Sequence, residues 1–410
     1  MQAFTHINPH YAHQKANKSY IKGCLIANAC SMGIYDLSNN SDLIYTTLAT
    51  TQSNYFRVET LQAASDLIWK KMQQLAIFND LNFTPGILHA AKDGQKIKTK
   101  IETFKAKHSI KYFGTGKGIV SLTTILNNMA IDTEIIGAHE YEGHFCFSYD
   151  LLFSNSLEIM LHRLSTDSAG GLILNHLLHG LKGVEFAPHY KSIAKKTELI
   201  GTFNNPKKYE GYLIKPTHKF KDQLIIDEQP NYQPIIAALF TKETKQSIVI
   251  KKLCSYTRKS KTKDALWEYN NIYLSIYLLK YIRDLKLRQD VRGALNRIEA
   301  YNQLHSTLES IGGKKSIGFS DPAIDIWNEC TRLLSNIIMY YNAYILSNFA
   351  ARMEAKGKKK AAAFIKRFST IATQHIILGG RHEFKDTDVI DLEQIMEQLE
   401  RIIGDLEDDH

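Results

Sequence analysis

A run of short strand-like segments with glycine between them constrains the fold of this chain more than any other feature. The segments lie between residues 87 and 188 of a 410-residue chain whose flanks have helical periodicity. Strand character is found at 87–97, 109–113, 119–126, 157–164 and 186–188. Helical patterns at 140–153 and 168–181 alternate with the later strands. This order of strands, a hairpin and helices predicts a mixed α/β layer.

The flanks of this layer have simpler patterns. Residues 20–80 are predicted to be helical, with the clearest helical period at 55–75. Between 191 and 231 the pattern gives way to Lys, Asn and Pro, which predicts an insertion or subdomain. From 232 onward the chain is predicted to be nearly all helix, with breaks at Gly312-Gly313 and Asp321-Pro322.

Composition narrows the class of protein. Hydrophobic residues make up 44% and charged residues 23%, which is ordinary globular composition, and the net charge of +9 fits a polyanionic partner. The five cysteines are scattered and lack a CxxC pair, which argues against a disulfide framework and for a reducing cytosol. The first residues are polar and no apolar run reaches membrane-spanning length, so we expect a soluble intracellular protein.

Two charged blocks lie near the end of the sequence. The first is basic and contains Lys356, Lys358, Lys359 and Lys360, and the second, at 393–409, is acidic with helical character. Runs of this kind are more often solvated faces than contacts to nucleic acid or a partner.

Three acidic residues stand in settings that suit metal chemistry. Asp93 follows a short apolar run, Asp167 ends an alternating run, and Glu299 lies on a long amphipathic helix. Carboxylates brought together from two strand regions and a helix can hold a pair of hard divalent cations, which assist phosphodiester chemistry.

Each of the three also has a simpler interpretation. Asp93 precedes Gly94, which is typical of a turn, and Asp167 lies where a helix cap is expected. Glu299 belongs to a polar stripe with Arg292, Asn296 and Gln303 that could equally face solvent. Taken singly, each aspartate is better explained by the simpler interpretation. Only the order and context of all three acidic residues together favour a metal site.

Several other motifs are set aside. The segment from His139 to His144 has one residue too many for a zinc-protease HExxH motif. The glycines at 114, 116 and 118 lack phosphate-loop spacing, so we interpret them as a hairpin connection between the strands at 109–113 and 119–126. No GxSxG nucleophile motif is present.

Ordered blocks of residues extend through nearly the whole chain. They include Asp93-Gly94-Gln95-Lys96, Lys111-Tyr112-Phe113-Gly114, Ser165-Thr166-Asp167-Ser168-Ala169-Gly170, Phe186-Ala187-Pro188-His189-Tyr190, Asn296-Arg297-Ile298-Glu299-Ala300-Tyr301-Asn302-Gln303-Leu304, Ile326-Trp327-Asn328-Glu329-Cys330 and Gly380-Arg381-His382-Glu383-Phe384. These blocks resemble those of the Tn-three family of transposases.

The resemblance implies an α/β fold with a ribonuclease-H-like mixed-sheet catalytic core of the DDE type. The core would comprise 83–190 plus 286–311, after a helical lead-in at 1–82 and interrupted by an insertion subdomain at 191–285. A helical region at 312–410 would follow. Carried over by motif, Asp93, Asp167 and Glu299 become the catalytic, metal-binding triad for Mg²⁺, with two ions expected and Mn²⁺ as a substitute.

The resemblance also implies a reaction and its partners. Hydrolysis at a transposon end would free a 3′ hydroxyl, and strand transfer would join that hydroxyl to target DNA. Double-stranded DNA is the expected partner, with a homodimer, no membrane, and a bacterial cytoplasmic location at the nucleoid when DNA is bound. Predicted DNA contacts are Lys111, Lys117, Arg292, Lys251, Lys252, Arg258, Lys259 and Lys261.

Two alternatives stay open at this point. Family transposases carry long N-terminal DNA-recognition regions, whereas this sequence starts just before the catalytic blocks. A truncated, non-catalytic DNA-binding or assembly module is therefore the first alternative. A ribonuclease-H-like nuclease acting on RNA–DNA hybrids is the second.

Overall fold

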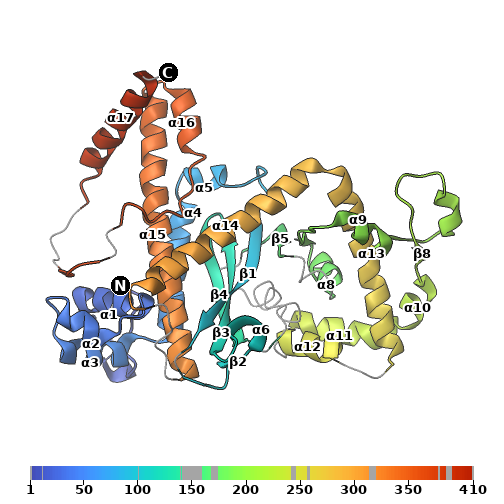
Figure 1. The fold of residues 1–410 in the computed structure, drawn as a ribbon, viewed down its shortest axis with the longest axis horizontal. Coiled ribbons are helices and arrows are strands. Elements are labelled where there is room, and N and C mark those ends of the chain that lie inside the picture. The colour runs from blue at the N-terminus through green and yellow to red at the C-terminus, as the bar shows by residue number, and fades with distance from the viewer. Residues whose placement is uncertain are drawn as a thin grey trace.

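The structure is a computed structural model with a central sheet and long helices around it (Figure 1). It describes residues 2–11, 13–99, 101–138, 140, 159–167, 174–241, 246–255, 259–313, 320–376, 379–384 and 390–408. The helix predicted at 140–153 therefore lies outside the described residues, apart from Glu140. The same is true of residues 168–173, the first part of the helix predicted at 168–181.

A mixed sheet forms the centre of the fold. Its strands are β1 (His89–Lys98), β2 (Lys107–His108), β3 (Lys117–Leu126), β4 (Met129–Gly137), β5 (Arg163–Ser165) and β6 (Glu185–Phe186). The order is β2-β3-β1-β5-β6, and β4 pairs with the same edge of β3 as β2. The β1–β3 and β3–β4 pairs are antiparallel, whereas β1–β5 and β5–β6 are parallel. The predicted mixed α/β layer is confirmed, and it is compatible with a ribonuclease-H-like core.

The strand predicted at 109–113 is wrong, because a short helix, α6 (Ile110–Phe113), occupies that place. Gly114 follows it with φ +60°, a backbone conformation that favours glycine. A Cβ on Gly118 would lie 2.3 Å from Cε2 of Phe113 and 2.6 Å from the carbonyl oxygen of Ile97. Gly114 and Gly116 lie in the connection between β2 and β3, which pair antiparallel, so the predicted hairpin connection is confirmed, but its first strand is 107–108 and not 109–113.

The tight hairpin lies one strand later and joins β3 to β4, a strand that the sequence patterns did not predict. Asn127 and Asn128 have φ angles of 45° and 61°. Two consecutive residues with positive φ are typical of a type I′ turn, where asparagine is favoured. The side chain of Asn127 also donates to the carbonyl oxygen of Phe78 at 3.2 Å, which ties this turn to the N-terminal helices.

Strand β5 is much shorter than the predicted strand at 157–164. It begins at Arg163, and residues 159–162 are not in a strand, although Leu161 is buried. The alternation of apolar residues before Arg163 therefore indicated a buried segment, but this segment does not pair as a strand. The strand predicted at 186–188 is confirmed in place as β6, which ends at Phe186.

Helices precede the sheet, as predicted for 20–80. The predicted helix at 55–75 is divided differently, because one helix ends at Tyr55 and the next begins at Val58. The elements are η1 (Pro9–Tyr11), α1 (Lys18–Ala29), α2 (Ile34–Asn39), α3 (Tyr45–Tyr55), α4 (Val58–Gln73) and α5 (Ile77–Asp80).

Short elements fill the segment predicted to be an insertion. They follow α8 (Asn175–Leu181), the described end of the helix predicted at 168–181. They are α9 (Ile193–Lys196), η4 (Thr197–Leu199), β7 (Gly201–Thr202), η5 (Pro206–Tyr209), β8 (His218–Lys219) and α10 (Asp222–Asp227), with β7 and β8 paired in parallel.

Helices make up most of the described chain from 229 onward, as predicted, although the described residues between 366 and 391 are not helical. The helices are α11 (Gln229–Thr241), α12 (Gln246–Ser255), α13 (Lys261–Arg283), α14 (Leu285–Ser310), α15 (Asp321–Ala355), α16 (Lys359–Ile365) and α17 (Leu392–Asp408). The predicted breaks are confirmed: α14 ends just before Gly312-Gly313, and α15 begins at Asp321-Pro322. The side chain of Ser320 caps α15 by accepting from the backbone N–H of Ala323 at 3.4 Å.

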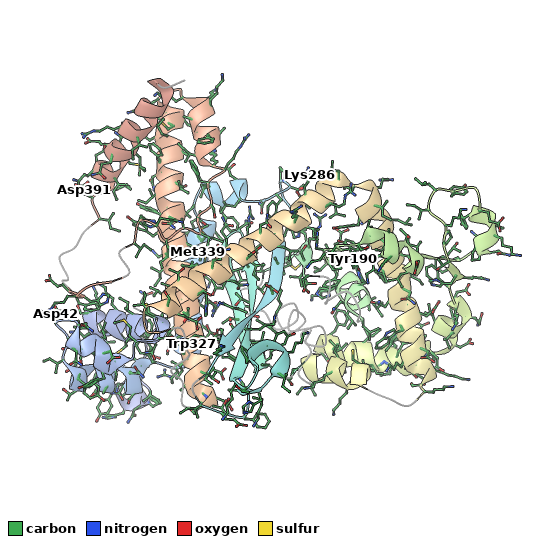
Figure 2. All side chains as sticks on the ribbon, viewed as in Figure 1. Asp42, Tyr190, Lys286, Trp327, Met339 and Asp391 are labelled. Carbon is green, nitrogen blue, oxygen red and sulfur yellow. The ribbon has the colours of Figure 1, made fainter. Side chains whose placement is uncertain are left out.

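The main hydrophobic core joins the sheet to helices α4, α5, α14 and α15. Helix α14 crosses the sheet obliquely and α15 runs past it (Figure 1). Ala90 and Ala91 of β1, Ile298 and Tyr301 of α14, and Met339 of α15 belong to one buried cluster. Met339 lies near the crossing of α14 and α15 (Figure 2). Burial of this apolar surface fixes the position of α14 on the sheet.

Candidate active site

Asp93 lies in the middle of strand β1. It pairs in register with Thr123 of β3, and the ladder continues past Gly94 to Lys98. The turn interpretation of Asp93-Gly94 is therefore wrong. Asp93 is half-buried, whereas Ala90 and Ala91 before it are fully buried. The strand thus presents a carboxylate at the border of the core.

Asp167 follows strand β5 at a level that the parallel ladder fixes. In this ladder Ala91 pairs with Ser165, and each aspartate comes two residues after its member of the pair. The ladder itself ends at Ser165, and Asp167 is exposed. The backbone N–H of His189 donates to the carbonyl oxygen of Thr166 at 3.0 Å, so the chain still follows the neighbouring segment there. Asp93 and Asp167 therefore each lie two residues beyond the last pair of the β1–β5 ladder.

The helix cap proposed for Asp167 cannot be placed on a described helix, because residues 168–173 lie outside the described residues. Helix α8 begins at Asn175, and its N-cap position is Leu174 rather than Asp167.

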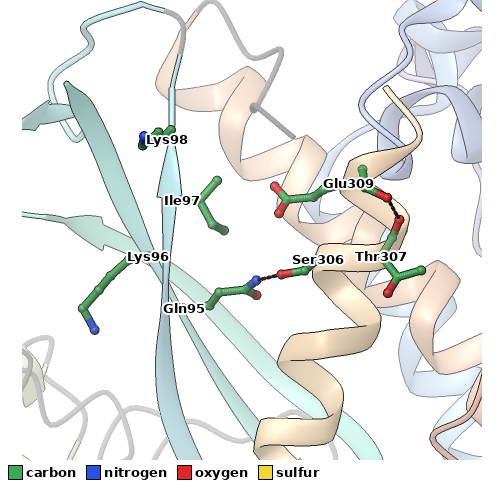
Figure 3. A pocket seen from close by; sticks show the side chains of 8 residues that line it. Gln95, Lys96, Ile97, Lys98, Ser306, Thr307 and Glu309 are labelled. Carbon is green, nitrogen blue, oxygen red and sulfur yellow. Dashed lines mark hydrogen bonds between the residues drawn. The ribbon is translucent and has the colours of Figure 1, made fainter. Parts of the chain in front are cut away.

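Helix α14 joins β1 directly beside Asp93. The side-chain amide of Asn302 donates to Oδ2 of Asp93 at 3.2 Å. Two residues along the strand, the Gln95 amide donates to Oγ of Ser306 at 2.7 Å (Figure 3). It also donates to the carbonyl oxygen of Asn302 at 3.3 Å. Glu299 lies three residues before Asn302, which is one turn away on the same side of the helix.

Glu299 itself is exposed. So are the other members of its polar stripe, namely Arg292, Asn296 and Gln303. The stripe thus faces solvent, and the contact to Asp93 comes from Asn302 at the border between the stripe and the buried face. The sequence patterns missed Asn302. The available signal was a polar side chain one residue after the buried Tyr301 and one turn after Glu299.

Arg297 anchors α14 two residues before Glu299. Its Nη2 donates to the carbonyl oxygen of Leu81 at 2.6 Å, and its guanidinium carbon lies 3.8 Å from the centroid of the Phe83 ring. Burial lowers the pKa of Arg297 to about 10, and the charge of Asp290 opposes that shift. The guanidinium is still charged at neutral pH, so it can hold the helix against the segment before β1.

A cavity of about 400 Å³ opens beside these contacts, between β1 and the last turns of α14. Its lining residues are Gln95, Lys96, Ile97, Lys98, Ser306, Thr307, Glu309 and Ser310. The side chains of Gln95 and Glu309 point into the space between strand and helix, whereas Lys96 points the other way (Figure 3). The cavity lies on the same strand face as Asp93, because Gln95 is two residues further along β1.

Comparison with known proteins decides the family. Residues 1–382 match the family described as the Tn3 transposase DDE domain. The chain belongs to that family. It is 24% identical over 396 residues to the transposase for transposon gamma-delta of Escherichia coli (strain K12), covering 93% of this chain and 38% of that protein. It is 20% identical over 402 residues to the transposase for transposon Tn4556 of Streptomyces fradiae, covering 95% and 43%.

A third relative of this Tn3 transposase DDE domain is the transposase for transposon Tn501 of Pseudomonas aeruginosa, 21% identical over 401 residues, with 94% of this chain and 39% of that protein covered. The chain spans about two fifths of the length of the curated relatives it matches.

Membership of a DDE family implies use of a divalent metal, and the donor set fits such an ion in kind. Asp93, Asp167 and Glu299 supply carboxylate oxygens, the ligands that Mg²⁺ prefers. Their positions in the structure, however, do not form a metal site. Among the residues that the structure describes, no three His, Cys, Asp or Glu side chains are grouped so as to hold a metal ion. The structure aligns β1, β5 and α14 but does not gather the three carboxylates.

The lysines and arginines predicted to contact DNA are dispersed over the surface. Lys117 pairs with Glu102 at 3.1 Å, and Lys251 donates to Glu140 at 2.7 Å. Lys111 lies 4.7 Å from the centroid of the Tyr112 ring. Lys252, Lys259, Lys261 and Arg292 are exposed, and Arg258 lies outside the described residues. Their contact with DNA stays a prediction.

Within the described segments, no helix combines the length and the apolar character needed to cross a membrane.

Proposed function

We propose that this chain is the catalytic part of a DNA transposase and that Asp93, Asp167 and Glu299 form its metal-binding triad. The observation that carries the proposal is the arrangement around β1. The β1–β5 ladder gives Asp93 and Asp167 equal positions on adjacent strands, and the Asn302–Asp93 hydrogen bond brings the Glu299 turn of α14 to the same strand. Membership of the DDE transposase family supports the same assignment.

Each side chain then has a role. Asp93 and Asp167 would bind divalent cations from two neighbouring strands, and Glu299 would bind from the helix. When bound, a pair of Mg²⁺ ions activates the attacking oxygen and stabilises the leaving oxygen of a phosphodiester. The cavity between β1 and α14 would receive the DNA strand that continues from the reacting phosphate, where Gln95 and Ser306 can contact its backbone.

The proposed reaction has two steps on double-stranded DNA. Water first cleaves the phosphodiester at a transposon end and leaves a 3′ hydroxyl. This hydroxyl then displaces an oxygen at a target phosphodiester and joins the two DNAs. Two copies of the chain would act together, one at each transposon end, at the bacterial nucleoid.

The test is a cleavage and joining assay with supercoiled plasmid, a precut transposon-like duplex, and Mg²⁺ or Mn²⁺. Wild-type protein is expected to nick or join DNA, while Asp93→Asn and Asp167→Asn lose this activity by at least a hundredfold. Asp36→Asn is the matched control, because Asp36 is exposed on α2, far along the chain from the site. Equal activity in wild-type protein and both site variants would refute the proposal.

A non-catalytic DNA-binding or assembly module is the second candidate. The observation that favours it is the lack of a three-carboxylate group among the described residues. It predicts DNA binding that weakens steeply with salt and that is unchanged in Asp93→Asn, together with no cleavage by wild-type protein.

A further inference from the structure

We infer that the loop between β7 and β8, residues 203–217, is a DNA-docking surface. Lysines on and beside this loop contact the phosphates of a duplex, and the exposed Leu213 enters its minor groove. The loop lies beyond α13 at the edge of the molecule, apart from the triad on β1, β5 and α14 (Figure 1). The inference rests on the proposed function in one respect, the choice of DNA as the polyanion.

The first argument is the charge of the segment that contains this loop. Residues 191–221 include eight lysines and two glutamates, with no arginine or aspartate, so they carry a net charge of +6, whereas the whole chain carries +9. All of these lysines except Lys196 are exposed, and none is among the DNA contacts predicted from the sequence. They are Lys191, Lys195, Lys196, Lys207, Lys208, Lys215, Lys219 and Lys221. Such a concentration of one charge favours a polyanionic partner.

The second argument is that the chain does not neutralise these charges itself. Other surface lysines pair with carboxylates, as Lys117 does with Glu102 at 3.1 Å. In the described part of the chain, no carboxylate forms an ion pair with any of the eight lysines at 191–221. A DNA duplex carries one negative charge about every 1.7 Å along its axis, and lysines that contact its phosphates release the condensed counterions. Contacts of this kind do not depend on base sequence.

The third argument is that the loop is held in shape by its own contacts. Strands β7 and β8 pair at its base, and the backbone N–H of Gly201 donates to Oγ of Ser275 on α13 at 3.0 Å. Within the loop, Oδ1 of Asn205 accepts from the backbone N–H of Lys207 at 3.0 Å and caps η5. A loop that is already ordered loses less conformational entropy when it binds a partner.

The fourth argument is the apolar surface that this loop exposes. Leu213 is 100% exposed, Tyr212 62% and Phe203 53%. The rings of Tyr212 and Phe203 still pack within the segment, with centroids 5.5 Å from Tyr209 and 5.0 Å from Phe220. Covering the Leu213 side chain with a partner would be favourable, because it removes apolar surface from water. Leucine is one of the side chains that proteins insert between base steps from the minor groove.

The experiment measures binding of the full chain to a fluorescein-labelled DNA duplex by fluorescence anisotropy at several KCl concentrations. EDTA is present, so the triad cannot contribute through a metal. The loop variant is Lys207→Gln/Lys208→Gln/Lys215→Gln. The matched control, Lys22→Gln/Lys70→Gln/Lys71→Gln, removes the same charge from exposed lysines of α1 and α4.

We expect the loop variant to raise the Kd for the duplex about tenfold or more at low salt. The slope of log K against log salt should become shallower by about 2 to 3, because each lost phosphate contact removes about 0.9. The control should keep the slope of the wild type. Leu213→Ser should raise the Kd about threefold to tenfold and leave the slope unchanged, because it removes apolar contact and no charge.

The outcomes separate this inference from the proposed triad. If the loop variant binds the duplex like wild type, or loses no more affinity than the control, these lysines face solvent or a protein partner and the docking surface is refuted. Wild-type affinity in Leu213→Ser would refute the insertion of Leu213. If the loop variant loses DNA binding while Asp93→Asn cleaves DNA as well as wild type, the docking surface stands and the triad falls. Normal binding by the loop variant, with cleavage that depends on Asp93, would give the opposite result.

Discussion

His89 and Ser165 share a buried hydrogen bond of 2.7 Å across the parallel strands β1 and β5. His89 begins β1 and Ser165 ends β5, so the bond spans most of the short ladder. Both side chains are almost completely buried, and Asp167 follows Ser165 by two residues. A polar bond inside the core fixes which residues pair, because any slip of β5 would leave His89 and Ser165 buried without each other.

Replacement of Ser165 tests this bond. Ser165→Ala leaves Nε2 of His89 buried without its partner, so we expect the free energy of unfolding to fall by about 1–3 kcal/mol. Urea unfolding followed by circular dichroism measures it. Ser53→Ala on the exposed side of α3 is the control and should change little. A loss as small as that of the control would show that the bond does not stabilise the sheet.

Buried histidines predict lower stability in acid. Burial, with Arg163 and Arg297, lowers the pKa of His89 to about 3, and burial lowers the pKa values of His176 and His179 to about 3 and 4. An unfolded histidine has a pKa near 6.5. The unfolded chain therefore binds more protons between these values, and stability falls as pH drops from about 6.5 toward 4.

Unfolding free energies at pH 7 and pH 5 measure this effect. Each buried histidine should contribute a loss of up to about 2 kcal/mol over that interval. His89→Gln should reduce the pH dependence of the unfolding free energy, and His10→Gln, at an exposed position, is the control. An unchanged difference between pH 7 and pH 5 in His89→Gln would contradict the assignment of a neutral buried His89.

A buried ion pair lies within α15, and its arginine also contacts β4. Arg332 contacts Oε2 of Glu329 through Nε and Nη2, both at 2.7 Å, and donates to the carbonyl oxygen of Ile131 at 3.2 Å. Arg332→Met leaves the Glu329 carboxylate buried without its cation, so we expect a loss of about 3–5 kcal/mol. The double variant Glu329→Gln/Arg332→Met should be more stable than Arg332→Met alone. Chemical unfolding of all four proteins gives the coupling, and simple additivity would refute it.

The acidic helix α17 packs one side against α15, while Glu393 and Glu397 are exposed, which agrees with the expected solvated face. Arg352 contacts Glu400 at 2.7 Å, Lys356 of the basic block contacts Glu400 as well, and Met396 is only 3% exposed. Partly exposed ion pairs contribute at most about 1 kcal/mol, whereas truncation of a buried methionine costs about 2–5 kcal/mol. Met396→Ala should therefore speed hydrogen exchange at residues 392–403 far more than Glu400→Gln. The reverse order would show that charge holds this helix.

Local patterns predicted the elements whose own residues determine them. Strands β1 and β3 and helix α14 are long and strongly patterned, and Pro322 with Asp321 marked the start of α15. The patterns failed where a contact from elsewhere decides the conformation. Residues 110–113 form a helical turn whose Phe113 packs over Gly118, and β5 is a strand only where it pairs with β1.

The candidate site likewise has one part that the sequence predicted and another that only the tertiary structure showed. The sequence by itself indicated the family, through ordered residue blocks, and the three acidic residues proposed as metal ligands follow from that resemblance. Only the tertiary structure decided that Asp93 and Asp167 each lie two residues beyond the same pair of two adjacent parallel strands, and that Asn302 contacts Asp93. The physical reason is distance along the chain. The paired residues Ala91 and Ser165 are 74 positions apart, and Asn302 is 209 positions from Asp93. Helical and strand periodicity reports only neighbours within a few residues.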